Sequence, residues 1–167
     1  MINLKYYIEG NLCSVKTSDA NIVIEERRNG NRRTVTVKAF QDIVLSDAYM
    51  YFKKYYNPED TVMANGYQSW TATKEFEMGE SLKDLDRLPG LLNKKYSFKA
   101  YGSQAFWKNA KKVPLGFDFS YIKGETPLFI GSYNYKNAYL LIWFEEEENR
   151  IKLQSDVEGK ELKAGET

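Results

Sequence analysis

One short segment of the chain, "NGYQSW" at positions 65–70, combines residue types that suit contact with a polar, ring-shaped ligand. Asn65 and Gly66 are a turn dipeptide, because both residues tolerate positive φ. Tyr67 and Trp70 offer ring faces, while Asn65 and Gln68 supply amide donors and acceptors. Sugars fit this set, since their C–H faces stack on rings and their hydroxyl groups pair with amides. The alternative is a tight turn whose rings fold back onto the core, and residue chemistry alone favours it because buried Trp is common.

The residue types that most enzymes use for nucleophilic or metal chemistry are scarce. The chain has no His, which excludes Ser-His and Cys-His dyads, histidine acid/base catalysis and the usual zinc sites. The one cysteine, Cys13, is expected to be a small buried apolar residue. The glycines have neither the phosphate-loop nor the dinucleotide-binding spacing. We therefore expect no metal site and no cofactor.

The acidic residues also provide no distinguished catalytic pair. Glycoside hydrolysis needs two carboxyl groups within roughly 5–10 Å, and any acid-rich β-domain can bring such pairs together by chance. The run 145–148 is typical of a solvated turn, and Asp84 and Asp86 suit the start of a helix. Asp118 and Asp156 lie in or beside expected strands, and nothing else singles them out. We expect none of these residues to be catalytic.

Composition and charge narrow the class of protein. The 167 residues are 43% hydrophobic and 28% charged, which is typical of a globular domain. Lys and Arg number 24 against 23 Asp and Glu, so no long-range field favours nucleic acid as the main partner. No signal-peptide pattern opens the chain, and the longest apolar run, Ala138 to Phe144, is too short to span a bilayer. We expect a cytoplasmic protein with no membrane partner.

Strand periodicity recurs along nearly the whole chain. The clearest case pairs an apolar run with an alternating one around Asn29-Gly30, which predicts a β-hairpin. A second case is a long strand, or two strands with a bend near Ser46-Asp47. Further strands are expected within 95–102, 126–134, 138–144 and 150–159, with 138–144 buried on both faces. One short helix is expected at Ser81 to Leu88, where Ser81 is a suitable N-cap and Pro-Gly follows.

These elements predict an all-β protein with an antiparallel two-sheet β-sandwich, favoured over a closed barrel. We expect a single domain over residues 1–167. The last segment, "SDVEGKELKAGET", contains turns and a short strand without a closing element. That ending suits a domain from the N-terminal part of a longer chain, although a complete chain can also end in this way.

The segment at 65–70 resembles a motif in the N-terminal region of bacterial α-galactosidases of glycoside hydrolase family 36 and close relatives. Three further segments, "AYGSQAFW", "GFDFSYIKGETPLFIGSYN" and "IKLQSDVEGKELKAGE", are similar to later segments of that region and occur in the same order. The resemblance covers Thr61 to Glu166, and residues 1–60 share only the β-character. It departs at Gly102-Ser103-Gln104, where many relatives place an acid after the glycine, so a polar role does not carry over to that position.

The resemblance implies a supersandwich-like β-domain that precedes a (β/α)8 barrel, with two Asp residues of the barrel as nucleophile and acid/base. Such a barrel typically needs about 250 residues, so none of its catalytic residues is carried by this chain. The implied function is a non-catalytic domain of an α-galactosidase-like hydrolase in carbohydrate metabolism, and this chain alone is expected to be inactive. Asn65, Tyr67, Gln68 and Trp70 would bind substrate at the rim of an α-galactoside site that a C-terminal barrel completes. A homo-oligomer is expected for the full-length enzyme.

Two other functions fit the same sequence. An autonomous carbohydrate-binding module would share the aromatic-rich sandwich but would bind sugar unaided, through a preformed platform. A purely structural interaction domain would use its rings as core and interface residues. Fold alone does not choose among the three functions.

Overall fold

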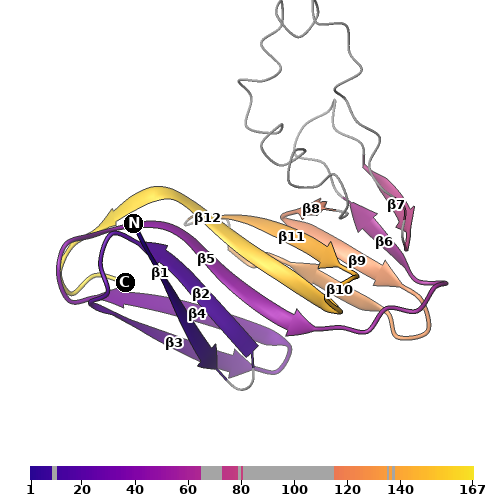
Figure 1. Cartoon of the computed structure of the whole chain (residues 1–167), viewed down its shortest axis with the longest axis horizontal. Coiled ribbons are helices and arrows are strands. Elements are labelled where there is room, and N and C mark those ends of the chain that lie inside the picture. Colours follow the sequence, from indigo (N-terminus) through magenta and orange to yellow (C-terminus); the bar gives the residue numbers. More distant parts are fainter. Residues whose placement is uncertain (9–10, 65–72, 79, 81–114, 135, 137) are drawn as a thin grey trace, which may run out of the picture. The chain divides into compact units, whose positions relative to one another are not determined.

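The computed structural model of the chain describes residues 1–8, 11–64, 73–78, 80, 115–134, 136 and 138–167 (Figure 1). Among these residues every regular element is a β-strand, and every strand pairing with a defined register is antiparallel. The all-β, antiparallel sandwich prediction is confirmed. The helix expected at Ser81 to Leu88 lies outside the described residues. In the part of the chain that is described, no helix is long and apolar enough to cross a membrane.

The chain divides into two compact units, and each is described by itself. Unit 1 comprises Met1–Phe52, Asn134–Tyr139 and Lys152–Thr167, and unit 2 comprises Lys53–Tyr133 and Leu140–Ile151. The expectation of a single domain over residues 1–167 stays a prediction.

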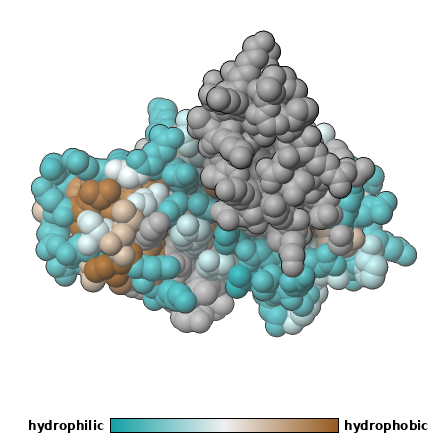
Figure 2. Space-filling view, turned by 45° about the horizontal axis from the view of Figure 1, so that its top comes forward, coloured by the Kyte–Doolittle hydropathy of each residue, from teal (hydrophilic) through white to brown (hydrophobic). Residues whose placement is uncertain are grey.

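Unit 1 consists of a sheet and a separate hairpin. The sheet is ordered β1-β2-β5-β12, from β1 (Ile2–Ile8), β2 (Asn11–Thr17), most of β5 (Ile43–Lys53) and most of β12 (Arg150–Leu162). The hairpin pairs β3 (Ile22–Asn29) with β4 (Arg32–Ala39). A core cluster joins the two layers and contains Val15, Ile22, Val37, Ala39, Ile43, Leu45 and Leu162. In the view of Figure 2, hydrophobic surface gathers over this unit, whose large exposed apolar side chains include Met1, Ile2, Val23 and Phe40.

The β3–β4 hairpin was expected from the sequence and is confirmed, with its turn one residue further along. Asn29 pairs with Arg32, so the two turn residues are Gly30 and Asn31 instead of Asn29 and Gly30. Gly30 has φ of 58°, while no positive φ is found at Asn31. This pattern is that of a type II′ turn, which needs glycine only at its first central position.

Strand β5 bends where the sequence predicted a bend. Lys16 pairs with Asp47 and Thr17 with Leu45, so Ser46 is an extra residue that forms a β-bulge. The bulge reverses the alternation of the strand, because side chains on the two sides of an inserted residue change parity. Before it Leu45 is buried, and after it Met50 is buried. The odd-numbered residues that follow the bulge therefore face away from the core cluster.

Unit 2 also has two layers. One is a sheet of order β10-β9-β6-β7, from β10 (Leu128–Gly131), β9 (Phe119–Lys123), β6 (Thr61–Ala64) and β7 (Lys74–Glu77). The other pairs β11 (Tyr139–Glu145), which begins in unit 1, with β8 (Leu115–Phe117). Leu141 to Phe144 are all buried, so burial on both faces is confirmed for this part of the strand, whereas Tyr139 near its start is exposed. The acidic run then forms an exposed turn, in which the Asn149 amide donates to the Glu146 carbonyl over 3.0 Å.

Candidate functional site

The residues predicted to bind substrate, Asn65, Tyr67, Gln68 and Trp70, lie outside the described residues. Their neighbours in the chain are described. β6 ends at Ala64 and β7 begins at Lys74, and these two residues pair directly in an antiparallel register. The motif therefore belongs to the connection of a β-hairpin in unit 2. Its contact with a ligand stays a prediction.

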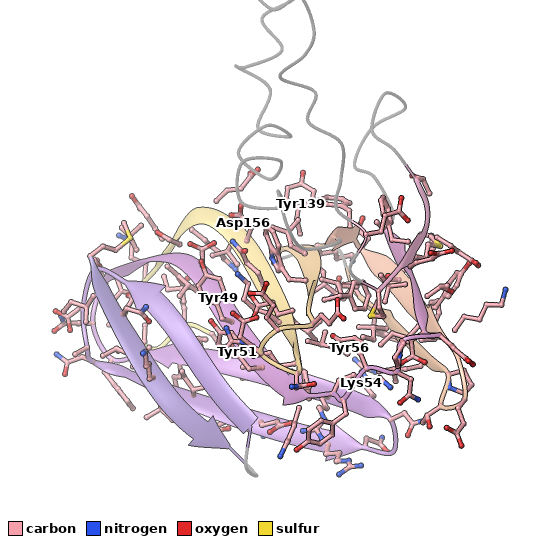
Figure 3. All side chains as sticks on the ribbon, turned by 45° about the vertical axis from the view of Figure 1, so that its right-hand side comes forward. Tyr49, Tyr51, Lys54, Tyr56, Tyr139 and Asp156 are labelled. Atoms are coloured by element: carbon pink, nitrogen blue, oxygen red, sulfur yellow. The ribbon has the colours of Figure 1, made fainter. Side chains whose placement is uncertain are left out.

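A second candidate lies in unit 1, on the face of the sheet that points away from the core cluster. We call it the polar–aromatic face, and it consists of Asp47, Tyr49 and Tyr51 from β5 and Lys152, Gln154 and Asp156 from β12. Figure 3 shows Tyr49, Tyr51 and Asp156 on these two strands. The bulge at Ser46 places the β5 members on this side, since Ala48 and Met50 between them pack toward the core. All six side chains are half-buried.

A hydrogen bond and a cation–π contact order this face. The Gln154 amide nitrogen donates to the Asp47 carboxylate over 3.0 Å. The Lys152 ammonium lies 5.4 Å from the centroid of the Tyr49 ring, a distance at which cation and ring attract. Burial, followed by the charge of Asp47, raises the pKa of Tyr49 from 10.0 to about 12. Tyr49 therefore stays neutral at ordinary pH.

The chemistry of the polar–aromatic face suits binding of a polyhydroxylated ligand. It offers aromatic rings, two carboxylates, one amide and one ammonium group within two neighbouring strands. Protein sites for neutral polar ligands use such a mixture of apolar surface and a few oriented polar groups. Across the described ranges no group of three or more His, Cys, Asp or Glu side chains could hold a metal ion. Among the described residues, this face shows no arrangement that identifies a nucleophile and its base.

Sequence reasoning did not select this face. Asp156 was noted as an acid near a strand, but Asp47, Tyr49 and Tyr51 were not considered as site residues. A local signal was present in "DAYMY" at positions 47–51, where polar or phenolic residues alternate with Ala48 and Met50. Alternation of this kind gives one apolar face and one face of rings and hydrogen-bonding groups.

Asp118 has an unusual backbone, which marks a corner in unit 2. It separates β8 from β9, has φ of 63°, and accepts a hydrogen bond from the Ser132 amide over 2.8 Å through its carbonyl. Burial raises the pKa of its carboxyl group, and no hydrogen-bond partner is found for its Oδ1 among the described atoms. Asp tolerates the left-handed conformation better than most residues. The corner itself gives a structural reason for aspartate here.

The corner also explains two neighbours in the segment "GFDFS". The Ser120 side chain is buried and its hydroxyl donates to the Met63 carbonyl. A Cβ at Gly116 would lie 2.7 Å from the Ser120 Cβ, so only glycine fits at that position. This part of the segment, which carries much of the resemblance, therefore has a packing role.

Asp60 is the most buried acid among the described residues of unit 2, with 1% of its surface exposed. It accepts a hydrogen bond from the Asn57 amide over 3.0 Å and pairs with the Lys54 ammonium at 3.7 Å. Next to it, Tyr56 donates to the Arg150 carbonyl over 2.9 Å, and burial raises the pKa of its phenol. Gly124 packs so closely that a Cβ there would lie 1.9 Å from the Asp60 Oδ1. These contacts give Asp60 a structural role, because its carboxylate is buried, hydrogen-bonded and paired with Lys54.

Comparison of the chain with protein-family models, with curated proteins and with solved structures finds no match.

Proposed function

We propose that this chain is a non-catalytic, carbohydrate-contacting β-domain of an α-galactosidase-like glycoside hydrolase. The observation that carries the proposal is the position of the motif at 65–70 between two strands that pair directly, with Ala64 opposite Lys74. Connections at the end of a sheet are where a rigid scaffold commonly positions ligand-binding residues. This position supports a rim role for Tyr67 and Trp70, with Asn65 and Gln68 as hydrogen-bonding partners of the sugar.

In this function the chain shapes a site whose chemistry is performed elsewhere. A C-terminal (β/α)8 barrel supplies the two catalytic Asp residues, and the present domain narrows the entrance for an α-galactoside and contributes to a homo-oligomer interface. The polar–aromatic face of unit 1 supports a carbohydrate ligand as well, because rings, carboxylates and amides gather on it. The chain by itself is expected to hydrolyse no aryl α-galactoside.

The test is Trp70→Ala in the enzyme that contains the barrel, with kcat/KM and melting temperature measured together. A rim Trp predicts that kcat/KM falls by about tenfold to a hundredfold, as expected for loss of one or two stacking contacts, while the melting temperature is kept. A core Trp predicts a loss of about 3–5 kcal/mol of stability instead. Tyr133→Ala is the matched control, because this ring is 79% exposed and lies outside the motif. A large drop in melting temperature with unchanged kinetics would remove the ligand role.

An autonomous carbohydrate-binding module is the second candidate, favoured by the polar–aromatic face. Titration of the isolated chain with galactose-containing oligosaccharides separates the two functions. A domain that forms half a site should bind at millimolar affinity or weaker, since one stacked ring offsets little of the cost of association. A module should bind at least about tenfold more tightly, and Tyr51→Ala should abolish that binding while Tyr133→Ala leaves it unchanged.

A further inference from the structure

Strand β10 is the end strand of the sheet β10-β9-β6-β7 in unit 2, and its outward residues are apolar. Phe129 is 70% exposed and Leu128 is 40% exposed. The strand "LFIG" contains no charged residue and no proline. Proteins usually protect such an edge with charges, prolines or bulges, because its backbone groups can pair with another strand. β10 has none of these devices within its bounds.

The register shows which backbone groups of β10 point away from β9. Ser132 lies opposite Asp118 in continuation of the register, and its amide donates to the Asp118 carbonyl over 2.8 Å. Backbone groups of successive residues in an antiparallel strand alternate between the two sides. Ile130 therefore points its N–H and C=O toward β9, and Phe129 and Gly131 point theirs away from β9, toward an edge at which no described strand pairs.

The side chains of β9 and β10 show how a ring is accommodated on this sheet. Phe119 of β9 pairs with Gly131 of β10, and its ring stacks with that of Phe129 at 6.4 Å between centroids and 23° between planes. A Cβ at Gly131 would lie 3.3 Å from both Phe119 and Phe129. Gly131 thus leaves the space that the neighbouring rings occupy, as aromatic residues opposite a strand glycine commonly do.

We propose that β10 pairs antiparallel with β10 of a second copy of this chain, about a twofold axis at Ile130. In this register Phe129 lies opposite Gly131 of the second copy, and the reverse pair is identical. Both residues direct their backbone groups to the open edge, so each pair can exchange two hydrogen bonds. A Phe would thus lie opposite a Gly across the twofold axis, as Phe119 already lies opposite Gly131 between β9 and β10. It makes the interface self-complementary, as a twofold dimer requires.

Charge and spacing favour a second copy over an unrelated strand. The paired segment is neutral and the whole chain has a formal net charge of only +1, so two copies do not repel strongly. An unrelated strand would need glycine and an aromatic residue at the same spacing as Gly131 and Phe129 to fill the same positions. The proposal rests on the proposed function only in giving a location to its homo-oligomer interface, and its test measures self-association without any sugar, so the two can fail separately.

Sedimentation velocity over a concentration series of the full chain is the first test. We expect wild-type protein to shift from monomer to dimer as concentration rises, and Phe129→Lys to stay monomeric. Tyr133→Lys is the control, since it adds the same charge at a ring that is 79% exposed but lies beyond β10, and it should dimerise like wild type. The proposal would be overturned if wild-type protein remained monomeric up to about millimolar concentration, because the dissociation constant would then be too high for a specific dimer. Equal dimerisation of wild type and Phe129→Lys would overturn it as well.

The second test concerns the register. In a Cys13→Ser background, Ile130→Cys places two thiols across the twofold axis, where directly opposite residues are close enough for a disulfide. Mild oxidation should yield a covalent dimer at least tenfold faster than Leu128→Cys, which keeps Phe129 and whose thiols are offset by four residues. Equal rates for the two variants would exclude this register. Circular dichroism of the reduced variants shows that both compared proteins are folded.

Discussion

The hairpins β3–β4 and β9–β10 both pair their strands antiparallel, but the residues exposed on their surfaces differ in chemistry. Exposed positions of the first are occupied mainly by charged residues, which are Glu25, Arg27, Arg28, Arg32 and Lys38. Exposed positions of β10 are Leu128, Phe129 and Gly131. Charged side chains disfavour pairing with a strand of another molecule, so the exposed positions of the first hairpin suit contact with solvent. The second hairpin ends in an edge strand with exposed apolar residues and no charged residue, and the dimer is proposed there for this reason.

The two hairpins also differ in the surroundings of their glycines. Substitution of these glycines is expected to give the largest difference in the free energy of unfolding. Gly124 follows β9 and packs against the buried Asp60, whereas nothing lies within 4 Å of a Cβ at Gly30. Gly124→Ala should lower the free energy of unfolding by about 3 kcal/mol, since Asp60 must give up its contacts with Asn57 and Lys54. Gly30→Ala should cost only about 1 kcal/mol, from the strain of positive φ.

Denaturant unfolding of the two variants measures this difference. Equal losses would mean that Asp60 moves aside without cost and that packing around it is loose. In that case Asp60→Ala should also be nearly neutral, which gives an independent check.

The hairpins illustrate which features the sequence can predict. β3–β4, the bend of β5 and the doubly buried β11 follow from local periodicity, because alternation of side chains requires only neighbouring residues. The turn was expected one residue too early, since Asn29-Gly30 and Gly30-Asn31 are both acceptable turns in isolation. The register decides between them, by pairing Asn29 with Arg32 and Val37 with Ile24.

Features that depend on distant segments could not be predicted. The polar–aromatic face requires β5 beside β12, whose contacting residues Asp47 and Gln154 are separated by 107 positions. The contact of Gly124 with Asp60 likewise joins two segments that share no local pattern. The alternation at 47–51 showed that one face would carry rings, but only the strand order shows which groups they meet.

The second comparison is between an ion pair within β3–β4 and one that joins β9 to β7. Arg33 pairs with Glu26 at 2.6 Å, and the Glu26 side chain is only 2% exposed. Lys123 pairs with Glu75 at 3.7 Å, with side chains that are 72% and 40% exposed. Arg33→Ala should cost about 2 kcal/mol, because it leaves a buried carboxylate without its cation and removes the Arg33 contact with the Phe52 ring. Lys123→Ala should cost less than about 0.5 kcal/mol.

Both losses are measured by denaturant unfolding at neutral pH. Glu26→Gln in the Arg33→Ala background should restore part of the stability, since the uncompensated charge is then removed. No recovery would show that Arg33 acts through packing on Phe52 and that the charge pair contributes little.

The smallest effect is expected from two tyrosines that have different surroundings. Burial and the charge of Asp47 raise the pKa of Tyr49 to about 12, while the pKa of the exposed Tyr121 is raised mainly by its hydrogen bond to Glu75. The unfolded chain releases the Tyr49 proton near pH 10.0, but the folded chain keeps it until about pH 12. Unfolding in this window therefore releases a proton, and the free energy of unfolding falls as pH rises.

Tyr49→Phe should make this alkaline loss smaller by on the order of 1 kcal/mol, a value reduced from the full shift because the phenol is partly exposed to solvent. Tyr121→Phe should change the pH dependence in the same direction but by much less, because its hydrogen bond to Glu75 is exposed to solvent. The measurement is urea unfolding of wild type and both variants between about pH 9 and pH 12, where all other titrating groups are common to the three proteins. Identical slopes for Tyr49→Phe and wild type would show that Tyr49 is open to water, and the polar–aromatic face would then lack a shielded phenol beside Asp47 and Lys152.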